Sequence, residues 1–223
     1  MSDASVLPRG RFITLEGGEG AGKSTQVRRL QGFLAGRGIR TVLTREPGGS
    51  PGAEILRHVL LSGGAEPFGA DAEAMVFAAA RGDHLRATIV PALNRGDWVI
   101  CDRFADSTRV YQGVAGAVDV ALISALERLT VGADAPDLTL ILDLPPKIGL
   151  ARAAARNAAA ADRFERQDLG FHTKLRKGFL ALAAAEPKRC VVIDASGDAD
   201  QVAGLIEATV AQHFALSNGR VPA

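Results

Sequence analysis

The chain has few cysteines. Only two occur among 223 residues, and Cys101 and Cys190 each adjoin an apolar run, W-V-I-C and C-V-V-I-D. A chain of this length can bury roughly 70% of its unfolded surface in one core, so it needs no disulfide to be stable. We interpret both residues as buried reduced thiols at strand ends rather than as a disulfide or a metal pair.

Long apolar runs and an excess of charge are also missing. The N-terminal residues M-S-D-A-S-V-L-P-R-G lack the apolar stretch of a signal peptide, and no run approaches the roughly 18 residues of a membrane span. With 26 Lys+Arg and 25 Asp+Glu, the net charge is +1, which is not the basic field of a nucleic-acid binder. We therefore expect a cytoplasmic protein that binds neither membrane nor nucleic acid.

Short apolar runs rich in β-branched residues alternate with longer segments that have apolar residues at helical spacing. Such alternation predicts an α/β fold, in which a five-stranded parallel sheet lies between two layers of helices in a three-layer α/β/α arrangement. Ligands then bind at the carboxyl ends of the strands. No linker or repeat divides the chain, so we expect a single domain over residues 1–223, with disordered ends at about 1–9 and 217–223. The predicted strands are 11–16, 40–44, 97–102, 137–144 and 190–194.

A phosphate-binding loop follows the first predicted strand. Residues 17–24 fit G-x-x-x-x-G-K-[ST] between that strand and a predicted helix, which is the context in which this motif is meaningful. The glycines allow backbone N–H groups to surround a phosphate, Lys23 reaches the β- and γ-phosphate oxygens, and the Ser24 hydroxyl is a Mg²⁺ ligand. A guanine-reading N-K-x-D stretch and a D-x-x-G switch, which a GTPase should carry, are absent, and the loop by itself predicts only that a nucleotide binds. The predicted nucleotide-binding residues of the loop are Gly17, Gly18, Glu19, Gly20, Ala21, Gly22, Lys23, Ser24 and Thr25.

Further polar stretches follow other predicted strands or lie on the helices that face them. Arg45 and Arg103 each come directly after a strand, where two guanidinium groups can hold a second phosphate through paired charged hydrogen bonds. Together with the phosphate loop they indicate two phosphorylated ligands that face each other. The stretches are T-R-E-P-G-G-S (44–50), F-A-A-A-R (77–81), D-R-F-A-D-S-T-R-V-Y-Q-G (102–113) and the Arg-containing run 151–165 that ends in D-R-F-E.

With these motifs in this order, the chain resembles thymidylate kinases of the bacterial branch, from Phe12 to about Phe214. The resemblance implies ATP-dependent phosphorylation of dTMP to dTDP for the synthesis of dTTP, with Mg²⁺ as cofactor. It also implies a homodimer. The apolar helices around 72–93 and 119–131 are candidates for the dimer face, although the same residues could be core.

The resemblance assigns four residues to the thymine base. Phe77 and Arg81 are four residues apart on a predicted helix and therefore share a face. In the family these positions stack on the ring and donate a hydrogen bond to its O4 oxygen, which suits a flat base with an acceptor edge. Ser107 and Thr108 match positions near the edge of the base.

The acceptor phosphate and the sugar are assigned to separate residues. By resemblance Arg45 and Arg103 hold the phosphate, and Pro47 shapes the loop that carries Arg45. Asp102 ends an apolar strand beside the phosphate loop, where it can orient Mg²⁺ or its waters and tether the arginines. Arg57, on the following helix, we interpret as a charge that points toward solvent.

The deoxyribose is expected to meet Tyr111, Gln112 and Glu19. By resemblance Tyr111 crowds the place of a 2′-hydroxyl, which favours deoxynucleotides. Glu19 is a carboxylate inside a phosphate-binding loop, and the resemblance makes it an acceptor for the 3′-hydroxyl of dTMP. The alternative is an exposed acid at a loop tip.

A lid is predicted at about 152–166. By resemblance Arg152 packs on adenine, and Arg156 stabilises the transferring phosphoryl group. About two extra residues between Arg156 and the D-R-F-E run leave open whether Arg156 or Arg163 makes the catalytic contact. The predicted catalytic residues are Lys23, Asp102, Arg103, Arg156 and Arg163.

Two other functions are compatible with a phosphate loop. A kinase on the same fold could phosphorylate dUMP, AMP or a free deoxynucleoside, but the paired arginines favour a phosphorylated acceptor, and Phe77 with Arg81 favours thymine. A non-catalytic ATP-binding switch would leave Phe77, Arg81, Arg103 and Tyr111 without a purpose.

Overall fold

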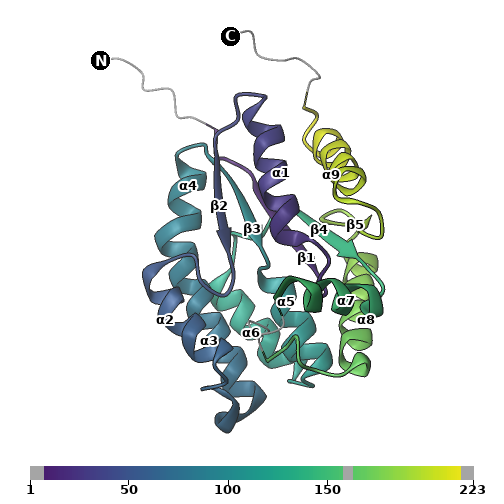
Figure 1. Ribbon diagram of the computed structural model, residues 1–223. Helices are drawn as coiled ribbons and strands as arrows, with labels where there is room; N and C mark the ends of the chain where they lie inside the picture. The colour runs from purple at the N-terminus through teal and green to yellow at the C-terminus, as the bar shows by residue number, and fades with distance from the viewer. Residues whose placement is uncertain (1–7, 158–162, 217–223) are drawn as a thin grey trace, which may run out of the picture.

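The computed structural model describes residues 8–157 and 163–216 (Figure 1). Its five strands form one parallel sheet, as the sequence predicts, and their order in the sheet is β2-β3-β1-β4-β5. Each predicted run of apolar residues is a strand, with bounds that differ by at most one residue. The strands are β1 (Phe12–Gly17), β2 (Thr41–Arg45), β3 (Trp98–Asp102), β4 (Leu138–Asp143) and β5 (Cys190–Asp194).

Helices cover both faces of this sheet. The longer ones follow the predicted helical spacing, and three short segments (η1 to η3) have 3₁₀ or π geometry. The elements are α1 (Lys23–Ala35), α2 (Pro51–Leu61), η1 (Glu66–Phe68), α3 (Gly69–His84), η2 (Leu85–Ile89), α4 (Val90–Asn94), α5 (Ala105–Thr108), η3 (Arg109–Ala115), α6 (Val120–Thr130), α7 (Pro146–Asn157), α8 (Leu169–Ala185) and α9 (Ala199–His213).

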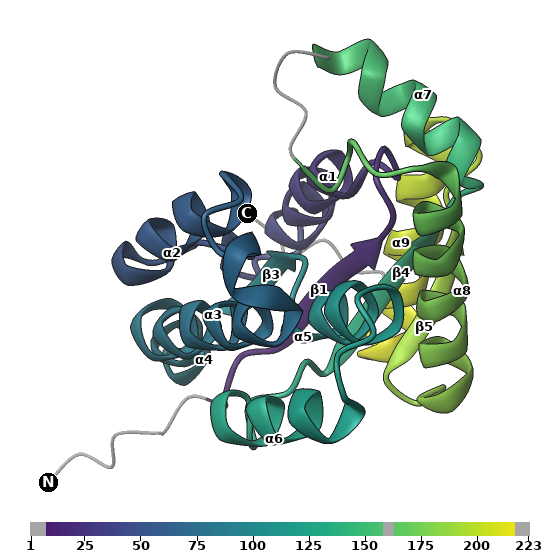
Figure 2. The ribbon, with the colours of Figure 1, turned by 90° about the horizontal axis from the view of Figure 1, so that it is seen from below.

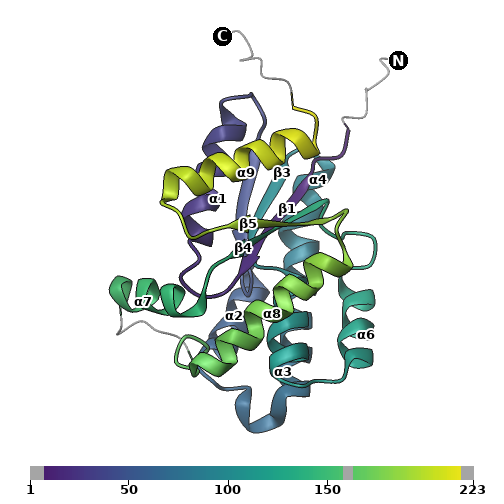
Figure 3. The ribbon, with the colours of Figure 1, turned by 90° about the vertical axis from the view of Figure 1, so that its right-hand side faces the viewer.

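The alternation of side chains along β1 divides the core into two layers. Ile13 and Leu15 are fully buried on the face covered by α1 and α9. Phe12 is fully buried on the opposite face, together with residues of η2, α4 and α5. Figure 3 shows α1 and α9 on one side of the sheet and α8, α3 and α6 on the other. Because successive strand residues point to opposite faces, Glu16 lies on the same face as Phe12.

Two contacts fix the loops at the carboxyl ends of the strands. Asp83 on α3 accepts hydrogen bonds from the Ser50 hydroxyl at 2.7 Å and from the Gly52 and Ala53 amides at 3.0 and 3.2 Å, which caps the first turn of α2. Gly20 has φ 68°, and a Cβ there would lie 2.0 Å from the Gly149 carbonyl oxygen of α7. The phosphate loop therefore packs closely on the first turns of α7. Figure 2 shows α1 and α5 on opposite sides of β1.

Both cysteines are buried and free, as predicted. Burial raises the pKa of the Cys190 thiol to about 12 and that of Cys101 well above its ordinary value. Near the N-terminus, Arg9, which lies within a predicted disordered end, forms an ion pair with Asp134 at 2.5 Å. Within the residues 8–157 and 163–216, no helix has both the length and the apolar character needed to cross a bilayer.

Candidate active site

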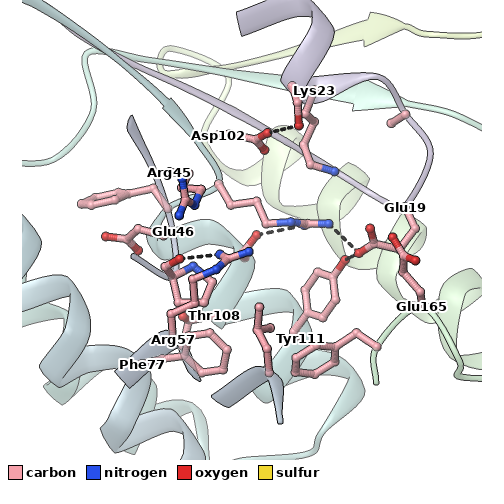
Figure 4. Close-up of a pocket in the computed structure, with 18 of the residues that line it drawn as sticks. Glu19, Lys23, Arg45, Glu46, Arg57, Phe77, Asp102, Thr108, Tyr111 and Glu165 are labelled. Atoms are coloured by element: carbon pink, nitrogen blue, oxygen red, sulfur yellow. Dashed lines mark hydrogen bonds and ion pairs between the residues drawn. The ribbon is translucent and has the colours of Figure 1, made fainter. Parts of the chain in front are cut away.

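A cleft opens at the carboxyl ends of β1, β2 and β3, with a volume of about 1060 Å³, open solvent included (Figure 4). The structure brings most of the predicted site residues to it. They are Glu19, Gly20, Ala21, Gly22, Lys23, Ser24, Arg45, Pro47, Phe77, Arg81, Asp102, Arg103, Ser107, Thr108, Tyr111 and Gln112.

The phosphate loop forms one end of the cleft. Gly22, with φ 88°, turns the chain into α1, and the Lys23 ammonium donates to the carbonyl oxygens of Gly17 and Gly18 at 3.1 and 2.8 Å. Burial, and then the charge of Arg103, lower the pKa of Lys23. Thr25 lies on the exposed first turn of α1 and does not line the cleft.

An oxygen pair suited to Mg²⁺ lies beside the loop. The Ser24 hydroxyl donates to Asp102 Oδ2 at 2.6 Å, and both residues line the cleft. Hydroxyl and carboxylate oxygens are ligands that Mg²⁺ accepts, and this ion commonly takes few protein ligands beside substrate phosphates. Among the described residues, no group of three or more His, Cys, Asp and Glu side chains could hold a metal ion. The Ser24 and Asp102 oxygens fit Mg²⁺ that arrives with a nucleotide, whose phosphates supply further ligands.

Arg103 lies between the phosphate loop and the rest of the cleft. Its guanidinium donates to the Gly17 carbonyl oxygen at 3.0 Å and to Glu19 Oε1 at 2.5 Å, and it lies 5.0 Å from the centroid of the Tyr111 ring. Although burial alone would lower it, Glu19 and the other acidic neighbours raise the pKa of Arg103 above its ordinary value. The side chain is only 17% exposed, so its charge is held at one place.

Glu19 points across the cleft and is not an exposed acid at a loop tip. Its side chain is 12% exposed and accepts hydrogen bonds from Arg103 at 2.5 Å and from the Tyr111 hydroxyl at 2.7 Å. Figure 4 shows Glu19 and Tyr111 facing each other. Burial would raise the pKa of this carboxyl, but Arg103 and Lys23 lower it to about 2. Glu19 is therefore a fixed negative charge at neutral pH.

A buried polar network supports Arg81 at the far end of the cleft. Arg81 donates to Glu46 Oε2 at 2.8 Å and to the Thr108 hydroxyl at 2.9 Å, and is 3% exposed. Glu46 Oε1 lies 3.1 Å from Nδ1 of His84, which is fully buried. Phe77 lines the same part of the cleft. The sequence reasoning missed Glu46 and His84. The available signal for Glu46 was an acid directly after Arg45 in the stretch R-E-P, which follows the second predicted strand.

Arg45, the last residue of β2, and Arg57, on α2, are both engaged by neighbouring groups. Arg45 donates to the two Glu54 oxygens at 2.9 and 3.1 Å, and its side chain is 53% exposed. The prediction that Arg57 points toward solvent is wrong. Arg57 lines the cleft and donates to the Pro47 carbonyl oxygen at 2.6 Å, because α2 turns this side of its surface toward the cleft.

In the described segment that begins at residue 163, Phe164 and Glu165 line the cleft and Arg163 does not. Arg163 forms ion pairs with Glu66 at 2.6 Å and with Glu73. Glu73 also accepts a hydrogen bond from Gln112 Nε2 at 2.8 Å. Arg163 therefore connects this segment to η1 and α3.

The remaining predicted arginines lie on α7. Arg152 does not line the cleft. It donates to the carbonyl oxygens of Ala195 and Ser196, each at 3.1 Å, in the loop between β5 and α9. Arg156 belongs to α7, and its side chain lies outside the described part of the structure.

The sheet is parallel, and a phosphate loop follows β1. A second group of arginines faces that loop across the cleft. These features together define a P-loop kinase with an anionic acceptor. The family model described as Thymidylate kinase matches residues 15–206. The chain belongs to the thymidylate kinase family.

Curated relatives agree along nearly the whole chain. A thymidylate kinase of Nitrobacter winogradskyi is 58% identical over 203 residues, which are 91% of this chain and 88% of the relative. One of Bradyrhizobium sp. strain ORS 278 is 57% identical over 210 residues, which are 92% of this chain and 93% of the relative. A third, of Rhodopseudomonas palustris strain CGA009, is 58% identical over 200 residues, which are 89% of this chain and 87% of the relative.

Proposed function

We propose that this protein transfers the terminal phosphoryl group of ATP to dTMP and releases ADP and dTDP, the precursor of dTTP. The observation that carries the proposal is a single cleft with a phosphate loop at one end and the Phe77–Arg81 pair at the other. Family membership supports the same reaction.

The donor is held at the phosphate loop. Lys23 and the loop amides contact the ATP phosphates, and Ser24 and Asp102 hold Mg²⁺. The ion, when bound, supplies positive charge to the phosphate oxygens of ATP. We assign the packing on adenine to Arg152, whose guanidinium is held by the carbonyl oxygens of Ala195 and Ser196 in the loop after β5.

The acceptor occupies the other end of the cleft. Phe77 stacks on thymine, while Arg81, held by Glu46 and Thr108, donates to its O4 oxygen. Arg103 and Arg45 bind the phosphate, and Pro47 shapes the loop of Arg45. The other base and sugar contacts are assigned to Ser107, Thr108, Gln112, Glu19 and Tyr111, the last of which excludes a 2′-hydroxyl.

Little covalent chemistry is required of the protein. The attacking phosphate oxygen of dTMP is already anionic, so no general base is needed, and catalysis consists of alignment, charge stabilisation and exclusion of water. We assign residues 152–166 to a lid that closes over the nucleotides. Because Arg163 is engaged by Glu66 and Glu73, we assign the contact to the transferring phosphoryl group to Arg156.

A homodimer in the cytoplasm is part of the proposal. Apolar side chains are exposed on α3 and on α6, where Val120 is 75% and Leu129 83% exposed, and Met75 is 49% exposed. Ala74 and Ile123 of the same helices are buried between them, so only the outer surfaces are available to a second copy. Sedimentation equilibrium measures the mass directly, and a monomer at micromolar concentration would contradict this part.

The acceptor is tested with a panel of nucleotides in an ADP-release assay. We expect dTMP to be used best, with AMP and free thymidine at least 100-fold poorer in kcat/KM. Equal rates with dTMP and AMP would refute the thymine assignment. A non-catalytic ATP-binding switch would show no release with any acceptor and no rise in melting temperature with millimolar dTMP.

A further inference from the structure

Glu16 is a fully buried carboxylate at the end of β1, immediately before the phosphate loop. Both of its oxygens accept hydrogen bonds from the turn after β3. Oε1 accepts from the amides of Phe104 at 2.8 Å and Ser107 at 3.2 Å, and Oε2 accepts from the Ser107 hydroxyl at 2.6 Å. A single side chain of β1 therefore holds three donors of one short segment.

That segment carries Arg103 in an unfavourable backbone conformation. Arg103 has φ 68°, which for a residue with a side chain costs about 1 kcal/mol or more and persists only when its surroundings enforce it. Its amide donates to the Leu15 carbonyl oxygen at 3.0 Å, and its carbonyl oxygen accepts from the Cys101 thiol at 2.9 Å. Glu16 accepts a hydrogen bond from the amide of Phe104, the residue after Arg103. Hydrogen bonds on both sides of Arg103 therefore fix its left-handed backbone conformation.

The side chain of Arg103 is connected to Glu16 as well. Ser107 Oγ donates to Glu16 and accepts from Arg103 Nη1 at 3.3 Å. The hydrogen bonds that run from Glu16 through Ser107 to Arg103 therefore orient the guanidinium of Arg103 as well as its backbone. We propose that Glu16 is a positioning residue for the acceptor phosphate, because its carboxylate holds Arg103 in the conformation that aims the guanidinium into the cleft. This inference rests on the proposed role of Arg103 in binding dTMP.

Several charges face Glu16 from the neighbouring elements. Asp106 on α5 is an acid, Arg103 and Lys23 are cations, and Cys101 on β3 is a neutral thiol. Asp106 is itself paired with Arg189 and Arg109. Burial first, and then Asp106, raise the pKa of Glu16 to about 7. Glu16 thus changes its protonation in the range in which a kinase can be assayed.

Protonation removes the charge opposite Arg103 and turns one acceptor oxygen into a donor that faces the Ser107 hydroxyl. Dissociation of Glu16 near pH 7 therefore favours dTMP binding, and its protonation weakens it. The pKa of Glu16 in the folded protein lies above its ordinary value. The free energy of unfolding therefore falls as pH rises from about 4.5 through 7, because the folded protein ionises Glu16 less readily than the unfolded chain does. Loss of the charge should not unfold the protein at pH 8.

Glu16→Gln tests the inference, with Glu207→Gln on α9 as the matched control. At pH 8 we expect the variant to raise the KM for dTMP about tenfold and to leave the KM for ATP and the inhibition constant of thymidine within about twofold. Thymidine shares the base and sugar of dTMP and lacks only the phosphate. The melting temperature should stay within about 4 °C of wild type, and Glu207→Gln should match wild type throughout.

The pH dependence supplies a second readout. The ratio of the dTMP KM in Glu16→Gln to that in wild type should fall toward one between pH 8 and pH 6. The phosphate of dTMP, whose second pKa is about 6, titrates equally with both enzymes and cancels in the ratio. A ratio below about twofold at pH 8, a ratio constant with pH, or an equal loss for thymidine would overturn the inference.

Two further variants keep the outcome unambiguous. If Glu16→Gln does not fold, Glu16→Asp is measured instead, because it keeps the charge but withdraws the carboxylate by one methylene from the Phe104 and Ser107 donors; a loss not confined to dTMP would overturn the inference. Arg103→Ala separates this inference from the proposed site. If it leaves the preference for dTMP over thymidine intact, the site assignment fails. If Arg103→Ala removes the preference for dTMP over thymidine and Glu16→Gln does not, the site assignment stands and only the proposed role of Glu16 fails.

Discussion

Replacement of Glu19 by Gln tests the electrostatic centre of the cleft. The Glu19 carboxylate accepts from Arg103 at 2.5 Å and from Tyr111 at 2.7 Å, and its pKa is about 2 against an ordinary value of 4.5. This separation of about 2.5 pKa units, at about 1.4 kcal/mol per unit, corresponds to about 3–4 kcal/mol of stability at pH 7. The amide keeps the shape but leaves the buried guanidinium without its charged partner.

The sign of the pH dependence follows from the lowered pKa. The contribution of Glu19 is fully present above about pH 4.5 and is lost as pH falls toward 2. Urea denaturation should therefore show Glu19→Gln destabilised by about 3–4 kcal/mol at pH 7, with a melting temperature lower by about 6–12 °C. At pH 3 the difference from wild type should shrink to less than half of that at pH 7.

Kinetics complete this test. Glu19→Gln should raise the KM for dTMP more than the KM for ATP, because the assigned partner of Glu19 is the 3′-hydroxyl of the acceptor. A free energy of unfolding within about 0.5 kcal/mol of wild type at pH 7 would refute the electrostatic reasoning, since that is the range of ordinary surface changes. A larger effect on the KM for ATP would refute the acceptor assignment.

Two other predictions concern the ends of the cleft. Arg156→Ala should lower kcat by about 10³ or more. Arg163→Ala should lower kcat by less than about tenfold, because Arg163 is paired with Glu66 and Glu73. Single-turnover rates measure both losses, and small losses in both variants would contradict the lid assignment. Glu46→Gln removes the charged partner of the buried Arg81. The preference for dTMP over dCMP, measured as the ratio of their kcat/KM values, should therefore fall about tenfold. An unchanged ratio would mean that Arg81 does not donate to the O4 oxygen of thymine.

Local patterns in the sequence were sufficient for the fold. Each predicted strand is a short apolar run with β-branched residues, and its length and position depend on neighbours in the sequence rather than on distant contacts. The phosphate loop is similarly local, because its function depends on backbone turns between one strand and one helix. These features could therefore be predicted to within a residue or so.

The polar interior could not be predicted in the same way. Glu16, Glu46 and His84 are buried because partners from distant parts of the chain satisfy them, such as Ser107 for Glu16 and Arg81 for Glu46. Sequence alone gives no such pairing, and an acid at a strand end can equally face solvent. Arg57 shows the same difficulty, because only the packing of α2 determines which side of that helix faces the cleft.

The central claim is that one cleft has a donor end at the phosphate loop and a separate acceptor end. Lys23→Ala tests it most directly, with turnover and the dTMP-induced rise in melting temperature measured on the same protein. We predict that turnover is abolished while the dTMP-induced rise remains that of wild type. Turnover near wild type, or loss of the dTMP response, would contradict the division of the cleft.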